Sequence, residues 1–79
     1  MSQKIVIDVR SPDEYNEGHR EGALNIPVDC ICRGEFAEIS DLPQDTPIEC
    51  YCASGARSER AKQVLNKCGF TNVTNAGGM

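Results

Sequence analysis

No stretch of this sequence is long and apolar enough to cross a membrane, since a helical span needs ~18 consecutive apolar residues. The N-terminus lacks the apolar core of a secretory signal peptide, because Met1-Ser2-Gln3-Lys4 runs directly into a predicted strand. Basic residues are too few for a nucleic-acid-binding face, with eight lysines and arginines against twelve aspartates and glutamates. We therefore expect no membrane and no nucleic-acid partner. We expect a cytoplasmic location, or a periplasmic one if a signal peptide has been removed.

The sequence also has no internal repeat, low-complexity tract or linker. Its 79 residues leave no room for a second domain and predict one domain over 1–79. A chain of this size buries only about 60% of its unfolded surface, so we expect modest stability. We expect a monomer.

An even set of cysteines is missing as well, because five cysteines cannot all pair within one chain. This count favours thiol chemistry over a disulfide framework. The pairs Cys30-Ile31-Cys32 and Cys50-Tyr51-Cys52 have one intervening residue, whereas structural zinc ligands are usually spaced by about two to four. We therefore expect no metal site.

Short apolar runs alternate with helix signals along the chain. The predicted strands are Lys4–Arg10, Gly22–Pro27, Ile48–Tyr51 and Phe70–Thr74, followed by a loop over Ala76–Met79. The predicted helices are a short one from Pro12 to about Glu17, a weaker one with Phe36, Ile39 and Leu42 on one face that Pro43 ends, and the clearest one over Ser58–Cys68. This alternation predicts an α/β fold, a small parallel sheet of about four to five strands flanked by short helices. Ligands bind beyond the carboxyl ends of the strands in such sheets.

The third predicted strand ends in a cysteine, Cys52, in a loop that opens directly onto a helix N-terminus. Backbone N–H groups and the positive end of the helix dipole then converge on the sulfur, which favours the nucleophilic thiolate. The candidate binding residues are those of the loop itself, Ala53, Ser54, Gly55, Ala56 and Arg57. The first four are small, so the backbone can curl around the sulfur, and Arg57 adds a cation suited to oxyanions. This pattern predicts an anion cradle around a catalytic thiolate, against the simpler interpretation of Cys52 as a small buried hydrophobe.

The spacing Cys-x4-Arg is one residue shorter than the Cys-x5-Arg loop of cysteine-dependent phosphatases. The tighter ring suits a terminal sulfur atom on Cys52 better than a tetrahedral phosphoryl group. A phosphatase or arsenate reductase is therefore a less favoured alternative.

Three segments in order resemble the rhodanese domain. They are Ile7-Asp8-Val9-Arg10 with Ser11-Pro12-Asp13-Glu14-Tyr15, then Gly18-His19 with Gly22-Ala23-Leu24-Asn25-Ile26-Pro27, then Tyr51-Cys52-Ala53-Ser54-Gly55-Ala56-Arg57-Ser58. The C-terminal Gly69-Phe70 and Ala76-Gly77-Gly78 also resemble that family. The compact length is most similar to small single-domain members of the phage-shock-protein E type. Arg20 departs from the pattern, because members often carry an apolar residue there.

The resemblance implies a rhodanese-like fold and a two-step sulfurtransferase reaction. The Cys52 thiolate would attack the outer sulfur of thiosulfate, release sulfite and become a persulfide, which cyanide or a thiol then accepts. The main-chain N–H groups of Ala53 to Arg57 would stabilise the persulfide charge. No metal or organic cofactor is implied. The alternative is a persulfide carrier or interaction module that a protein partner charges.

Other polar residues and cysteines have weaker functional signals. We expect Asp8 and Arg10 to form a structural ion pair, His19 to be a surface or structural histidine, and Arg60 to be solvated or to attract substrate. Cys68 falls on the apolar face of the last helix and is predicted to lie in the core. A further hypothesis is that Cys30 or Cys32 lies near the pocket, where it resolves the persulfide or forms a regulatory disulfide.

Overall fold

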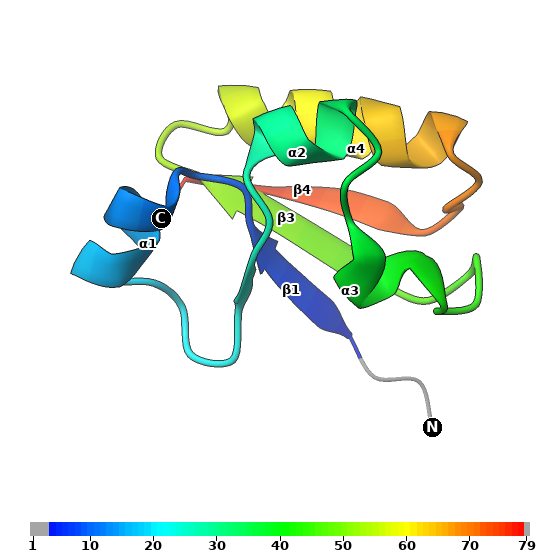
Figure 1. Ribbon diagram of the computed structural model, residues 1–79, viewed down its shortest axis with the longest axis horizontal. Coiled ribbons are helices and arrows are strands. Elements are labelled where there is room, and N and C mark those ends of the chain that lie inside the picture. Colours follow the sequence, from blue (N-terminus) through cyan, green and yellow to red (C-terminus); the bar gives the residue numbers. More distant parts are fainter. Residues whose placement is uncertain (1–3, 79) are drawn as a thin grey trace.

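A four-stranded parallel sheet with the strand order β2-β1-β3-β4 forms the centre of the computed structural model, which describes residues 4–78. The elements along the chain are β1 (Ile5–Asp8), α1 (Pro12–Glu17), β2 (Leu24–Asn25), α2 (Val28–Cys32), α3 (Ala37–Ser40), β3 (Ile48–Cys52), α4 (Ala56–Lys67) and β4 (Val73–Gly78). Helices α2 and α4 lie side by side over one face of the sheet, and α1 lies at its carboxyl end (Figure 1). The predicted α/β class, with a parallel sheet and short helices, is confirmed.

The core lies between the sheet and the helices that cover it. Its fully buried side chains come from the apolar runs of β1 and β3 and from single positions on the helices, and they include Ile7, Ile48, Cys50, Ile31, Ile39, Ala61 and Leu65. Strands buried in a parallel sheet read as continuous apolar runs, which is why β1 and β3 are visible in the sequence.

Helix α1 begins and ends where the capping signals predict. The Ser11 hydroxyl accepts from the Glu14 N–H, and the Glu14 carboxylate accepts from the Ser11 N–H, which completes the capping box. The helix stops at Gly18, whose N–H donates to the Tyr15 carbonyl. The sequence therefore defines α1 by local chemistry alone.

The last strand differs from its prediction. Strand β4 begins at Val73, and it includes Ala76–Gly78, which the sequence analysis assigned to a loop. Residue 79 of that predicted loop lies outside the described residues. Glycine has low strand propensity, but a Cβ at Gly78 would stand 2.5 Å from the Ala53 carbonyl oxygen. Only glycine lets β4 run this close to the loop after β3, so close approach explains the missed strand.

Two helix boundaries also differ. Helix α4 starts at Ala56, two residues before the predicted Ser58, because Gly55 adopts a left-handed conformation (φ 96°) that turns the chain directly into the helix. It ends at Lys67, and Cys68 is exposed, so its assignment to the core is wrong. The Cys68 N–H still donates to the Val64 carbonyl at 3.0 Å, so Cys68 continues the helical turn, but the core that buries Ala61 and Leu65 does not extend to its side chain.

The segment between the second and third strands contains two helices instead of one. Helix α2 has five residues and no side-chain cap, which is too short for a periodic apolar pattern to reveal. In α3 the predicted face is confirmed at the buried Ile39, although the helix ends at Ser40, before Pro43. Across residues 4–78, none of the helices combines the length and apolarity that a membrane crossing requires.

Candidate active site

Cys52 is the last residue of β3, and its side chain is fully buried below the turn that leads into α4. The Gly55 N–H donates to the Cys52 Sγ at 2.9 Å, and the Ser58 Oγ lies 3.6 Å from the same sulfur. A Cβ at Gly55 would stand 3.4 Å from the Gly77 Cα, and φ at Gly55 is left-handed, so this turn requires glycine. The loop thus folds its backbone donors onto the sulfur, as the small residues predict.

The surroundings of Cys52 favour its thiolate. Burial by itself raises the pKa of the Cys52 thiol, but hydrogen bonds from the N–H and hydroxyl of Ser58 and from the N–H groups of Ser54 and Gly55 outweigh it. Together they lower the pKa of Cys52 from 9.0 to about 7. Cys50, two residues earlier on the same strand, has no such donors, and burial followed by the charge of Glu49 raises its pKa to about 12. The structure therefore selects one reactive thiol from two neighbours.

This contrast predicts the pH dependence of alkylation. Iodoacetamide reacts with the thiolate, so the rate at Cys52 is expected to rise with pH, with a midpoint at about pH 7, and then to level off. Cys50 is expected to stay unreactive until the fold is lost. Quantification of the alkylated peptides by mass spectrometry across the pH range measures both. A midpoint at the ordinary value of 9.0 for Cys52 would contradict the geometry of the loop.

The five predicted loop residues contribute unequally. The N–H groups of Ser54 and Gly55 bond the sulfur, and the side chains of Ala53 and Ala56 are exposed at the rim. Ser58 was missed as a site residue, although its hydroxyl and N–H both reach the sulfur. A serine one position after the arginine at a helix start was the available signal.

Arg57 does not extend its guanidinium to the sulfur. It forms a bidentate ion pair with the Glu14 carboxylate of α1, with Nη1–Oε1 at 2.7 Å and Nη2–Oε2 at 3.0 Å. These bonds, followed by those from Ser11, lower the pKa of Glu14 to about 2. Arg57 therefore ties α4 to α1, and its contact with a substrate stays a prediction.

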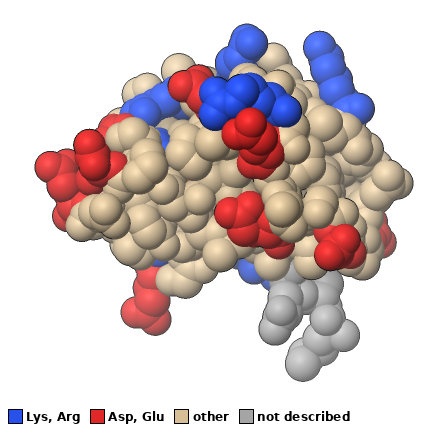
Figure 2. Space-filling model, in the orientation of Figure 1, with Lys and Arg blue, Asp and Glu red and all other residues tan. Residues whose placement is uncertain are grey.

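Helix α4, which starts at the loop, carries net positive charge although the chain carries a net charge of −4. Basic side chains lie along the upper edge of the molecule, over α4, with acidic side chains among them, and a group of acidic side chains lies over α1 (Figure 2). Helix α4 carries Arg57, Arg60, Lys62 and Lys67 against the single acidic Glu59. Because α4 starts at the thiol loop, its positive charge and its N-terminal dipole both favour an anion there.

A pocket of about 510 Å³ opens beside Arg57, between the start of α1 and helix α2. Cys30 and Arg33 form part of its wall, and the Arg33 Nη2 lies 3.6 Å from the Cys30 Sγ. Cys32 is exposed outside this wall, where its Sγ accepts from the Arg60 Nε at 3.4 Å. Cys30 thus shares a pocket with Arg57, the last residue of the thiol loop, whereas Cys52 is not among the residues that line it. The hypothesis that Cys30 or Cys32 acts on the Cys52 persulfide stays a prediction.

Asp8 and Arg10 form the predicted structural ion pair at the end of β1. The Arg10 Nη2 lies 2.7 Å from the Asp8 Oδ2, and the Arg10 N–H and Nε also donate to this fully buried carboxylate. Burial raises the pKa of Asp8, but the hydrogen bonds from Arg10 outweigh it and lower the pKa below its usual value. The same guanidinium donates to the Gly18 carbonyl at 2.6 Å, so the pair also fixes the end of α1.

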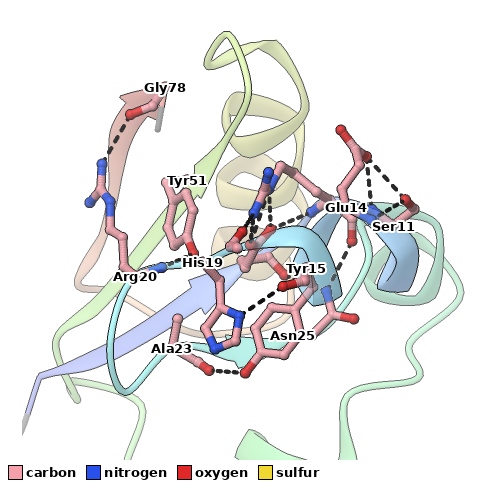
Figure 3. A network of polar contacts seen from close by, with 12 residues as sticks. Ser11, Glu14, Tyr15, His19, Arg20, Ala23, Asn25, Tyr51 and Gly78 are labelled. Atoms are coloured by element: carbon pink, nitrogen blue, oxygen red, sulfur yellow. Dashed lines mark hydrogen bonds and ion pairs between the residues drawn. The ribbon is translucent and has the colours of Figure 1, made fainter.

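His19 and Arg20 have structural contacts near this pair (Figure 3). His19 is exposed and stacks on the Tyr15 ring at 3.6 Å, as expected for a structural histidine. The Arg20 guanidinium lies 4.4 Å from the centre of the Tyr51 ring and donates to the Gly78 carbonyl at 3.0 Å. The departure from the family pattern at Arg20 therefore anchors the end of β4.

The five cysteines are free thiols. Within residues 4–78, no three cysteine, histidine, aspartate or glutamate side chains are grouped so that they could hold a metal ion.

Comparison with known proteins identifies the domain. The family model of the rhodanese-like domain matches residues 1–79. The chain is 37% identical over 73 residues to the thiosulfate sulfurtransferase PspE of Escherichia coli K12, covering 92% of this chain and 68% of PspE. It is 38% identical to the uncharacterized protein YqhL of Bacillus subtilis, of which it spans 55%.

Solved structures give the same result. A rhodanese from E. coli, solved with anions, superposes with a TM-score of 0.85 at 36% identity and covers 96% of this chain and 87% of its own. The human single-domain sulfurtransferase TSTD1 superposes with a TM-score of 0.80 at 28% identity, covering 96% of this chain and 77% of its own. The chain therefore belongs to the rhodanese-like domain family.

Proposed function

We propose that this protein moves a sulfane sulfur through a persulfide on Cys52, from a small anionic donor such as thiosulfate to a thiol or cyanide. It is a rhodanese-type sulfurtransferase, the class that the names of PspE and TSTD1 carry. The observation that supports the Cys52 route is the geometry of its loop: the N–H of Gly55, the residue before α4, donates to the Cys52 Sγ at 2.9 Å, which favours the thiolate.

The loop can support both half-reactions. In the first, the Cys52 thiolate forms a bond to the outer sulfur of thiosulfate, and the sulfur–sulfur bond of the donor breaks with release of sulfite. In the second, an acceptor thiolate or cyanide takes the outer sulfur, and Cys52 leaves as a thiolate. The N–H groups of Ser54, Gly55 and Ser58 point at the sulfur and stabilise its negative charge before and after each step. We infer that Ala53, Ala56 and Arg57 complete the substrate-binding loop.

The mass of the intact protein tests this proposal. Incubation with thiosulfate is expected to add about one sulfur atom to the mass, and cyanide is expected to remove it and form thiocyanate. The matched control is Cys52→Ser, which keeps the free thiols Cys30, Cys32 and Cys68 and is expected to gain no sulfur. No adduct on the folded, unmodified chain would contradict the thiosulfate route.

A persulfide carrier charged by a protein partner is the second candidate. It uses the same thiolate, and the exposed basic side chains of α4 beside the loop favour contact with a partner surface. The two functions separate by donor: rapid loading from thiosulfate supports the enzyme, and loading only from a persulfidated protein supports the carrier. The location, in the cytoplasm or the periplasm, stays a prediction. The monomeric state also stays a prediction, and light scattering would test it.

Cys30 is predicted to receive sulfur from the Cys52 persulfide, because it lines the pocket that Arg57 also lines and Arg33 lies against its sulfur. In this transfer the Cys30 thiolate forms a bond to the outer sulfur. The bond between that sulfur and Cys52 breaks, and Cys52 leaves as a thiolate. Peptide mass spectrometry after thiosulfate loading is expected to find persulfide on Cys30 and not on Cys32, its matched control on the same helix. Equal labelling of the two cysteines, or labelling that persists in Cys52→Ser, would contradict the transfer.

A further inference from the structure

Asn75 of β4 connects three parts of the site through its side-chain amide. Its Oδ1 accepts from the Ser58 hydroxyl at 2.6 Å and from the Gly77 N–H at 2.8 Å. Its Nδ2 donates to the Gly55 carbonyl at 3.1 Å and to the Glu59 carboxylate at 3.0 Å. Four hydrogen bonds therefore hold one amide between the thiol loop, the first turn of α4 and the end of β4.

These partners fix which way the amide faces. The Gly77 N–H is a donor and requires the oxygen of Asn75, while the Gly55 carbonyl and the Glu59 carboxylate are acceptors and require its nitrogen. A flipped amide would place donor against donor and acceptor against acceptor. The Asn75 oxygen is thus held against the Ser58 hydroxyl.

The Ser58 hydroxyl has one proton and three neighbours that can take it. The Asn75 Oδ1 lies at 2.6 Å, the Gly55 carbonyl at 3.0 Å and the Cys52 Sγ at 3.6 Å, and the Ser58 side chain is fully buried. While Cys52 is a thiol, its S–H donates to the Ser58 oxygen, and the hydroxyl proton is free for Asn75. Once Cys52 is a thiolate it can only accept, and the hydroxyl stabilises it by turning its proton toward the sulfur, in addition to the bond from the Gly55 N–H.

We propose that Asn75 and Cys52 compete for the single hydroxyl proton of Ser58, which makes Asn75 the positioning residue that sets how readily the thiol ionises. The inference deepens the proposed function and rests on Cys52 as its nucleophile. In the thiol form the proton lies on the bond to Asn75, and in the thiolate form it lies on the bond to sulfur. Asn75 keeps its hydrogen bond from the Gly77 N–H in both forms. Rotation of the Ser58 hydroxyl therefore breaks one hydrogen bond to Asn75 but does not leave the amide oxygen without a partner.

Few charged groups lie around the Ser58 hydroxyl, Asn75 and Cys52. Arg57 of α4 attracts the thiolate while it is paired with Glu14 of α1, and Glu59 of α4 bonds the far side of the Asn75 amide. Asp8 and Arg10 at the end of β1 are paired with each other. None of these groups replaces the hydroxyl as the donor beside the sulfur, so a change at Asn75 reaches Cys52 mainly through Ser58.

Two substitutions at Asn75 are expected to shift the pKa of Cys52 in opposite directions. Asn75→Asp offers the hydroxyl a charged acceptor, adds negative charge and exchanges the donor to Glu59 and to the Gly55 carbonyl for an oxygen, and is expected to raise the pKa of Cys52 by on the order of one unit. Asn75→Ala removes the nearer competing acceptor, leaves the Gly55 carbonyl at 3.0 Å, and is expected to lower the pKa. Site-resolved alkylation against pH measures both, with Asn72→Asp on the exposed surface before β4 as the charge-matched control that leaves the pKa unchanged. Two shifts in the same direction would overturn the proposal, and either variant alone tests its own sign if the other fails to fold.

A double-mutant cycle separates this route from a direct charge effect. Ser58→Ala is expected to raise the pKa of Cys52 by itself, because the thiolate loses a donor. In the Ser58→Ala background, the shift caused by the neutral substitution Asn75→Ala is expected to fall to a small fraction of its original value, whereas Asn75→Asp keeps the part of its shift that its charge causes directly. An unchanged shift for Asn75→Ala in that background would show that Asn75 acts without Ser58 and would overturn the proposal. Alkylation needs no sulfur donor, so this result stands apart from the thiosulfate assay that tests the proposed function.

Discussion

Replacing Cys52 with serine is expected to abolish persulfide formation and sulfur transfer, a loss on the order of a thousandfold or more. A serine hydroxyl stays protonated near neutral pH, and the donors that lower the thiol pKa to about 7 cannot make it a comparable nucleophile. The measurement combines intact mass after thiosulfate with the rate of thiocyanate formation.

The control for this prediction is Cys68→Ser, which makes the same chemical change at an exposed thiol after α4. It is expected to load and transfer sulfur at the rate of the unchanged protein. Persulfide on the Cys52→Ser variant, at a comparable rate, would mean that another cysteine carries the sulfur. Residual loading of Cys30 alone, with no turnover, would instead indicate slow direct chemistry in the pocket.

Replacing Asp8 with alanine is expected to lower the free energy of unfolding by about 3 to 5 kcal/mol, since it leaves the buried Arg10 guanidinium without its charged partner. At about 0.05 to 0.15 kcal/mol per residue, a domain of 79 residues has about 4 to 12 kcal/mol of stability, so the loss is a large share of the total. We therefore expect a clearly lower urea midpoint. Urea titration followed by far-UV circular dichroism measures the change.

Two further variants serve as controls for the effect of Asp8→Ala on stability. Glu35→Ala breaks the exposed ion pair with Arg33, and is expected to change the free energy of unfolding by less than about 1 kcal/mol. Asp8→Asn keeps an acceptor at the same place and is expected to recover part of the loss. An Asp8→Ala protein as stable as Glu35→Ala would show that solvent enters and satisfies Arg10, contrary to its burial in the structure.

Local chemistry explains what could be predicted from the sequence. The capping box of α1 lies within four consecutive residues, and the donors for the Cys52 sulfur come from residues at most six positions away. Buried parallel strands also give continuous apolar runs, so the α/β class is visible without any contact information. Each of these features depends on residues that are only a few positions apart in the sequence.

Predictions failed where the next element in space decides the outcome. The glycine-rich end of β4 was assigned to a loop because glycine disfavours strands, yet its close approach to Ala53 requires glycine. Cys68 continues the apolar period of α4, but no neighbouring element buries it, and it is exposed. A short stretch of sequence does not show which segment will lie beside a strand. It also does not show how far along a helix the buried face extends.

The sequence alone determined the kind of site: a thiol at the end of a strand, under backbone donors at the start of a helix. The tertiary structure decided which side chains tune it. Arg57 pairs with Glu14 across 43 residues, Ser58 with Asn75 across 17, and Arg20 with the carbonyl of Gly78 across 58. The loop donors reach the sulfur through the local turn of the backbone, whereas these partners meet only because the parallel sheet brings the carboxyl ends of its strands to one edge.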